Sequence, residues 1–232
     1  MEDNTVSVLV TMVLGIEIIG DLPIYISYQS ADVWASSQNF MLDAKKRLAC
    51  VAGVPPDIYA EKGQLWGNPV YDWEYMKKDG FSWWLNRLIF SQKCYDHIRI
   101  DHFIGFANYY SIPANAADAV MGQWNKAYGR ELFEKFKEKV PNAKILAEDL
   151  GNKTKEVENL LEFTGYPGMV ILQNWYDSPD VSKFLNSLKQ NNIVVYTGTH
   201  DNNTIKGWYK SISKSEKKAY RKITGCKLDV IK

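Results

Sequence analysis

The chain has 232 residues, of which 46% are hydrophobic and 24% charged, and its formal net charge is +1. This balance is typical of a globular protein and is compatible with one large domain. The near-neutral charge gives no argument for binding to nucleic acid or to an anionic membrane surface, and no apolar run reaches the about 18 residues that a membrane span requires. The cysteines Cys50, Cys94 and Cys226 show neither a metal-binding spacing nor a disulfide framework, which predicts a reducing, cytoplasmic location.

The N-terminal region predicts one short buried strand. Val6 to Leu14 is apolar, but its start is acidic and no cleavage site follows, so it does not indicate a signal peptide. Ile16 to Ile19 is predicted as the first strand. The sequence Gly20-Asp21-Leu22-Pro23 is predicted as the turn that ends it, with one carboxylate in the turn.

Residues 25–80 are predicted to form a long, aromatic-rich loop insertion after the first strand. The sequences VPPD at 54–57 and GNP at 67–69 cannot lie inside helices. A long irregular segment inside a compact domain is either functional or disordered. Disorder is disfavoured by the aromatic residues of the segment, which include Trp34, Tyr59, Trp66, Tyr71 and Trp73. We interpret the segment as an ordered cover over an active site.

From residue 81 onward, hydrophobic periodicity predicts alternating helices and strands. The predicted helices are Phe81 to Cys94, Glu131 to Val140, Thr154 to Phe163 with Thr154 as its cap, Val181 to Lys189, and about Ser213 to Ile223. The predicted strands are 97–101, 144–147, 168–172 and 193–196. Because the strands are short, apolar and β-branched, the pattern predicts an α/β fold with a parallel sheet covered by helices.

The strand at 97–101 carries an unusual polar face. Ile98 and Ile100 lie on one side of an extended chain, whereas Arg99 and Asp101 share the other. The guanidinium favours the ionised form of the neighbouring carboxylate. Such a pair is either a structural ion pair or the setting of a nucleophile or electrostatic stabiliser.

Carboxylates follow the predicted strands at their C-terminal ends. These side chains are Asp21, Asp101, Glu148 and Asp201, with Arg99 and His200 beside two of them. In parallel α/β folds these ends meet at one edge of the sheet, where active sites lie. The sequence therefore predicts an active site built from carboxylates.

Paired carboxylates favour glycoside chemistry over the alternatives. Metal-dependent hydrolysis requires clustered ligands, but the three histidines, His97, His102 and His200, show no recognised spacing. The sequence also contains neither a G-x-S-x-G nucleophile elbow nor a glycine-rich phosphate loop. We therefore expect neither a metal nor another cofactor.

Six sequence blocks resemble the 4-α-glucanotransferase family, also called amylomaltases or disproportionating enzymes, of the wider α-amylase clan. The blocks are IGDLPIY at 19–25, AGVPPD at 52–57, GQLWGNP at 63–69, RIDHF at 99–103, AEDLG at 147–151 and GTHDN at 198–202. The resemblance implies a (β/α)8 TIM barrel. It also implies transfer of α-1,4-glucan segments between malto-oligosaccharides with retention at the anomeric carbon.

The resemblance also implies roles for individual residues. Asp101 matches the nucleophile, Glu148 the general acid/base that carries the proton, and Asp201 the carboxylate that stabilises the distorted transition state. The residues implied in substrate binding are Asp21, Arg99, His200, Trp66, Asn68, Asp57 and Tyr59. Trp66 serves either as a sugar platform or as a core residue, since aromatic side chains do both.

Two features depart from the family pattern. Ile104 stands where many members have a second arginine, and the family is much longer than this chain. The resemblance implies a partial barrel over residues 15–232, from about the third to the seventh strand, preceded by an unmatched segment at 1–14. Alternatives to an active transferase are an inactive or glucan-binding piece of the enzyme and a related α-glucan hydrolase. We expect the chain by itself to be marginally stable or to aggregate, and to be inactive on maltotriose. The sequence indicates no oligomeric state.

Overall fold

The structure is a computed structural model that describes residues 14–57, 60–151, 153–177 and 192–224. The chain divides into two compact units, Met1–Tyr166 and Pro167–Lys232, and each is described by itself.

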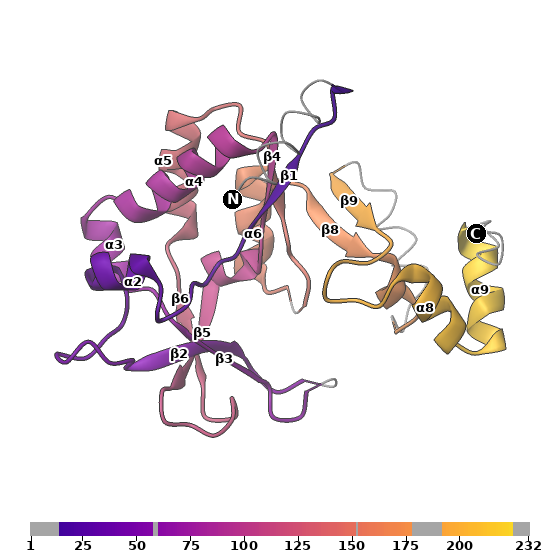
Figure 1. The fold of residues 1–232 in the computed structure, drawn as a ribbon, viewed down its shortest axis with the longest axis horizontal. Helices are drawn as coiled ribbons and strands as arrows, with labels where there is room; N and C mark the ends of the chain where they lie inside the picture. The colour runs from indigo at the N-terminus through magenta and orange to yellow at the C-terminus, as the bar shows by residue number, and fades with distance from the viewer. Residues whose placement is uncertain (1–13, 58–59, 152, 178–191, 225–232) are drawn as a thin grey trace. The chain divides into compact units, whose positions relative to one another are not determined.

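A parallel three-stranded sheet forms the centre of the first unit. Its strand order is β1-β4-β7, where β1 is Ile19–Leu22, β4 is His97–Ile100 and β7 is Ile145–Ala147. The two pairings start at Ile19 opposite His97 and at Ile98 opposite Ile145. Ile98 and Ile100 are fully buried, as the alternation along the strand predicts. Figure 1 shows β1 and β4 running alongside each other.

Three helices contribute to the core of this unit. They are α4 at Ser82–Cys94, α5 at Gly129–Lys139 and α6 at Lys155–Thr164. Helix α4 packs against β1, β4 and α5, and α5 packs against α6. Their shared core includes Trp84, Leu88, Phe133, Phe136 and Leu160. All three helices agree with the sequence prediction. Thr154 is the N-cap residue of α6, but its side chain makes no capping hydrogen bond.

A second, antiparallel sheet shows that the loop prediction for residues 25–80 is wrong. Its order is β3-β2-β5-β6, with β2 at Cys50–Val54, β3 at Gln64–Pro69, β5 at Asn108–Pro113 and β6 at Gln123–Lys126. The helices α2 at Ala31–Ala35 and α3 at Trp73–Lys78, and the short 3-10 helix η1 at Ser37–Asn39, lie in the same stretch. Strand β3 tolerates Pro69 because it lies at the edge of the sheet.

The first strand also differs from its prediction. It covers Ile19–Leu22 rather than Ile16 to Ile19, so Asp21 lies within the strand and not in a turn after it. Asp21 is directly opposite Arg99 in the register of β1 and β4. Gly20 serves close packing, because a Cβ atom there would lie 2.1 Å from Cδ2 of Tyr95.

In its described residues, 167–177 and 192–224, the second unit contains a parallel pair of strands and two α-helices. Strands β8 at Gly168–Ile171 and β9 at Ile193–Tyr196 pair in register from Gly168 opposite Ile193. The 3-10 helix η3 covers Leu172–Asp177, and helices α8 and α9 cover Ile205–Ser211 and Lys214–Thr224. A small core joins Trp208, Tyr209, Ile212 and Tyr220. The predicted helix Val181 to Lys189 lies outside the described residues.

The five strands predicted as parallel each run parallel to their partners inside their own unit, which confirms the α/β class. Within the described part of the chain, no helix is both long and apolar enough to span a membrane.

Candidate active site

Arg99 joins two of the predicted carboxylates in the first unit. Its Nη1 donates to Oδ1 of Asp21 at 2.7 Å and to Oδ1 of Asp101 at 3.2 Å. The Arg99 side chain is 9% exposed, whereas Asp21 and Asp101 are 44% and 37% exposed. Burial alone would lower the pKa of Arg99, but Asp21, Asp101 and Glu148 together raise it above its ordinary value. Arg99 is therefore a fixed cation with a carboxylate on either side.

Glu148 lies beside Asp101 because their strands are hydrogen-bonded neighbours. The last register pair of β4 and β7 is Ile100 with Ala147, and Asp101 and Glu148 are the next residues of the two strands. The amide of Glu148 donates to the carbonyl of Ile100 at 2.9 Å, which continues the ladder past the end of β7. The sheet thus brings two carboxylates together that are far apart in sequence.

The environment of Glu148 favours its protonated form. The residue is 8% exposed, and burial raises the pKa of Glu148 above its ordinary value. Backbone N–H groups of His102 and Leu150 oppose this rise, since they donate to Oε2 at 2.7 Å and to Oε1 at 2.9 Å. The charge of Asp101 adds to the rise. The two N–H groups also fix the orientation of the carboxyl group.

His102 contributes a backbone N–H group to the site, and the sequence did not indicate this contribution. It adopts a left-handed conformation with φ of 44°, just before the 3-10 helix η2 at Phe103–Phe106, and its N–H is a donor to Glu148. Burial of the ring lowers the pKa of His102 to about 4. The ring also packs edge-on against Trp66, with their ring centroids 4.9 Å apart. A positive φ at a non-glycine residue has no sequence signal that would have found it.

The remaining predicted residues of the first unit lie in or near the antiparallel sheet. Trp66 is half-buried on β3 and donates from Nε1 to Gln64 at 3.1 Å, and Asn68 donates to the carbonyl of Ile26 at 3.0 Å. Asp57 Oδ1 accepts from the amide of Ala60 at 2.7 Å. Tyr59 lies outside the described residues.

His200 and Asp201 belong to the second unit. His200 Nε2 lies 3.5 Å from Oδ1 of Asp201, and both side chains are exposed. Their loop is held by Asn202, whose Oδ1 accepts from the amide of Thr199 at 2.9 Å. Gln173 supports the same loop, donating to the carbonyls of Thr197 at 2.9 Å and Asn203 at 2.7 Å.

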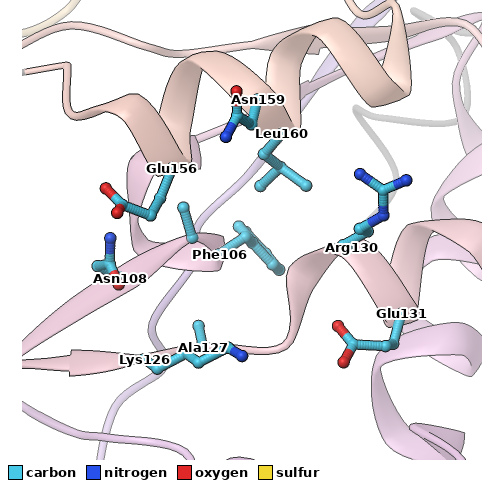
Figure 2. Close-up of a pocket in the computed structure, with 10 residues that line it drawn as sticks. Phe106, Asn108, Lys126, Ala127, Arg130, Glu131, Glu156, Asn159 and Leu160 are labelled. Carbon is cyan, nitrogen blue, oxygen red and sulfur yellow. The ribbon is translucent and has the colours of Figure 1, made fainter.

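In the described residues, the predicted carboxylates neither form a metal-binding cluster nor line the hollow between β5, α5 and α6. Among residues 14–57, 60–151, 153–177 and 192–224, no group of three or more His, Cys, Asp or Glu could hold a metal ion. The hollow has a volume of about 540 Å³, and none of the predicted site residues that the structure describes lines it (Figure 2). Its lining includes Asn108 on β5, Arg130 on α5, and Glu156 and Asn159 on α6.

The fold is of the α/β class, and Asp101 and Glu148 follow two paired parallel strands at one edge of the sheet. The sequence model of one family, described as 4-alpha-glucanotransferase, matches residues 11–229. The chain belongs to this family.

Similar proteins agree with the family match. The 4-alpha-glucanotransferases of Streptococcus pneumoniae and Thermus thermophilus are 50% and 48% identical over 196 and 206 residues, which are 84% and 88% of this chain. A solved amylomaltase from Streptococcus agalactiae, in complex with acarbose, superposes with a TM-score of 0.83 at 43% identity over 90% of this chain. The matches cover 39%, 41% and 42% of these proteins, so the chain spans about two fifths of their length.

Proposed function

We propose that the chain carries the catalytic carboxylates of a retaining 4-α-glucanotransferase, which moves α-1,4-glucan segments between malto-oligosaccharides. One observation carries the proposal: Asp101 and Glu148 end two paired parallel strands, with a buried arginine bonded to Asp101 and a raised pKa at Glu148. A retaining enzyme requires one ionised and one protonated carboxyl group in these positions.

In the first step, a carboxylate oxygen of Asp101 attacks the anomeric carbon of the donor glucan. The glycosidic C–O bond breaks, and Glu148 gives its proton to the departing oxygen. The products are a glycosyl ester on Asp101 and a shortened glucan that leaves with a new hydroxyl group.

In the second step, a hydroxyl group of the acceptor glucan attacks the same carbon. Glu148, now ionised, takes the proton of that hydroxyl, and the ester bond to Asp101 breaks. Two inversions give net retention, and both carboxyl groups return to their starting protonation states.

The other predicted residues are proposed to bind the sugars. Arg99 orients Asp101. Asp201, with His200 beside it, holds sugar hydroxyls and stabilises the distorted transition state, and Asp21 accepts hydrogen bonds from sugar hydroxyls. Trp66 offers an aromatic face, and the remaining proposed contacts are Asn68, Asp57 and Tyr59. We further propose that the five parallel strands are the third to seventh of a (β/α)8 barrel. We also propose a cytoplasmic location, as the cysteine spacing suggests.

We expect the carboxyl groups of Asp101 and Glu148 to lie about 5–5.5 Å apart in the ligand-bound enzyme, the separation of a retaining pair. A crystal structure with a bound oligosaccharide measures it. A separation of about 6.5–9.5 Å, which leaves room for an attacking water, would indicate inversion instead.

A chimera tests the proposal. The stretch of the Thermus thermophilus relative that this chain matches is replaced by the corresponding residues of this chain, and the chimera is incubated with maltotriose. We expect glucose together with longer oligosaccharides, and no products from the matched Asp101→Asn chimera.

Other product patterns contradict the proposal. Glucose and maltose without longer chains would show an α-glucan hydrolase. A folded chimera that leaves maltotriose unchanged would show that these carboxylates do not support transfer. Incubating the chain alone with maltotriose tests in parallel the expectation that it is inactive by itself.

A further inference from the structure

A second hollow of the first unit lies beside α2 and includes none of the proposed active-site residues. Its volume is about 700 Å³, within the range of about 300–1,000 Å³ that small-molecule sites occupy. Its lining combines aromatic, hydroxyl and amide groups, among them Tyr28, Gln29, Ser30, Trp34, Ser37 and Lys46.

Trp34 lies outside the core formed by the described residues of the first unit. Its side chain is 87% exposed, whereas its neighbour Val33 is 4% exposed and anchors the helix in the core. Helix α2 is held by the Ser30 side chain, which accepts from the Val33 amide, and by Asp32, which accepts from Nε1 of Trp83 at 3.2 Å. Trp34 is therefore presented to solvent from a fixed backbone.

The groups around Trp34 are held in place before any ligand binds. The Tyr28 hydroxyl donates to the carbonyl of Lys46 at 2.8 Å, and Nζ of Lys46 donates to Oγ of Ser37 at 2.7 Å. Lys46 sits in a turn with φ of 63°, and Asp43 stabilises the turn by accepting from the amides of Lys45 and Arg47 at 2.8 and 2.9 Å. Such pre-organisation reduces the entropy cost of binding.

The chemistry of this hollow suits a neutral, hydroxyl-rich ligand with an apolar face. An indole ring stacks on the C–H face of a pyranose, while hydroxyl and amide groups bond to the sugar hydroxyls. Among the described residues that line the hollow, Lys46 is the only charged one, and its ammonium group is already bonded to Ser37. A nucleotide or another anion would need more positive charge than this.

We propose that this hollow, named here the Trp34 site, binds a segment of α-1,4-glucan separately from the reacting bond. This proposal rests on the proposed function for the choice of glucan. It assigns Trp34 as the stacking platform, Tyr28 as a second aromatic wall, and Ser30 and Gln29 as partners for sugar hydroxyls. The site would hold a long glucan on the enzyme between transfer events.

Affinity electrophoresis of the chain through gels containing amylose tests the Trp34 site without requiring activity. We expect Trp34→Ala to weaken retardation roughly tenfold, because aromatic anchors dominate binding energies. The matched control is Trp124→Ala, since Trp124 is 45% exposed on β6 and lies outside the lining. Because the electrophoresis measures glucan binding by the chain itself, its result does not depend on the chimera. An inactive chimera would refute the proposed function, and the Trp34 site would still be tested.

A second measurement needs no variant. On titration of the unsubstituted chain with maltoheptaose, the indole N–H resonance of Trp34 should shift in a saturable way while that of Trp124 stays in place. An unchanged Trp34 resonance, or a Trp34→Ala variant retarded as strongly as the parent, would overturn the proposal. So would a Trp34-dependent self-association seen by light scattering, which would assign this surface to a second copy of the chain.

Discussion

At the residue scale, Glu148 is the group whose environment most directly serves the proposed chemistry. The sheet buries its carboxyl group beside Asp101, and two backbone N–H groups hold it in one orientation. Burial favours the neutral acid, whereas the N–H groups favour the anion, so both protonation states are supported. A general acid that later acts as a base requires this balance.

Glu148→Gln, made in the chimera, should slow transfer from maltotriose by about 10²–10⁴-fold. A glycosyl fluoride donor needs no protonation of its leaving group, so its first step should slow far less. Steady-state rates with both donors measure the difference. Equal slowing of the reactions with both donors would show that Glu148 is not the general acid.

The pH dependence of transfer should also show that Glu148 acts as the general acid. The pKa of Glu148 is raised, so the residue keeps its proton to a higher pH than an ordinary glutamate with a pKa of 4.5, and loses it as the pH rises further. The rate should therefore fall on the alkaline side, at a pH above that ordinary value. Profiles of kcat/KM against pH measure this limb, and Glu148→Gln should lack it.

Arg99→Met separates a structural ion pair from a functional one. Methionine fills the buried space but removes the cation between Asp21 and Asp101. Both carboxylates are more than a third exposed, so water screens them and we expect a stability loss of only about 1 kcal/mol. Transfer should fall by about 10²-fold or more. Urea unfolding and maltotriose assays measure the two effects, and a large stability loss with unchanged transfer would favour the structural role.

At the scale of elements, the antiparallel sheet supports the proposed site from the side. Strand β3 carries Trp66, which meets His102 edge-on, and His102 in turn donates to Glu148. Strand β2 lies between β3 and β5, so it connects this support to the rest of the sheet. A substitution that disrupts β2 should therefore also displace Trp66.

Gly53→Ala tests the packing of this sheet. A Cβ atom at Gly53 would lie 2.1 Å from the carbonyl oxygen of Gln64 and 2.5 Å from Cδ1 of Ile112, so backbone must move. We expect destabilisation of about 1–3 kcal/mol in urea unfolding. Gly20→Ala is the comparison variant, because its Cβ atom would meet side-chain atoms of Tyr95, which is 42% exposed, and no backbone atom, so its loss of stability should be smaller. A smaller loss for Gly53→Ala than for Gly20→Ala would contradict this packing account.

At the scale of the whole molecule, the parallel strands leave apolar edges in contact with water. Within the described residues β1 pairs with β4 alone, and Ile19 on β1 is 49% exposed. Among the described residues of the second unit, β9 pairs with β8 alone, and Val195 is 43% exposed. Unpaired apolar edge strands pair readily with other chains.

Ile19→Lys should reduce self-association of the chain while leaving its melting temperature nearly unchanged, because a lysine on an edge strand opposes pairing and this side chain is half exposed. Light scattering across a concentration series measures the association. The matched control is Ile98→Lys, which introduces the same charge into the buried core and should unfold the first unit. A parent chain that stays monomeric at all concentrations would contradict the expectation.

The sequence by itself determined the features that depend on short-range pattern. Hydrophobic periodicity predicted α4, α5 and α6 and the strands β4, β7, β8 and β9, because burial of one face needs only residues close in sequence. The alternation at 98–101 predicted the Arg99–Asp101 pair, and the motif blocks predicted the family.

Only the tertiary structure decided the features that depend on distant partners. Strand β2 forms because β5, more than fifty residues later, supplies hydrogen bonds that its own glycine-containing sequence does not signal. The start of β1 is set by its pairing with β4, which moves Asp21 from a predicted turn into a strand opposite Arg99. The left-handed turn at His102 and its bond to Glu148 arise from the same pairing of strands. Backbone hydrogen bonds and ion pairs between distant residues leave no periodic trace in the sequence, so these features became visible only once the chain was folded.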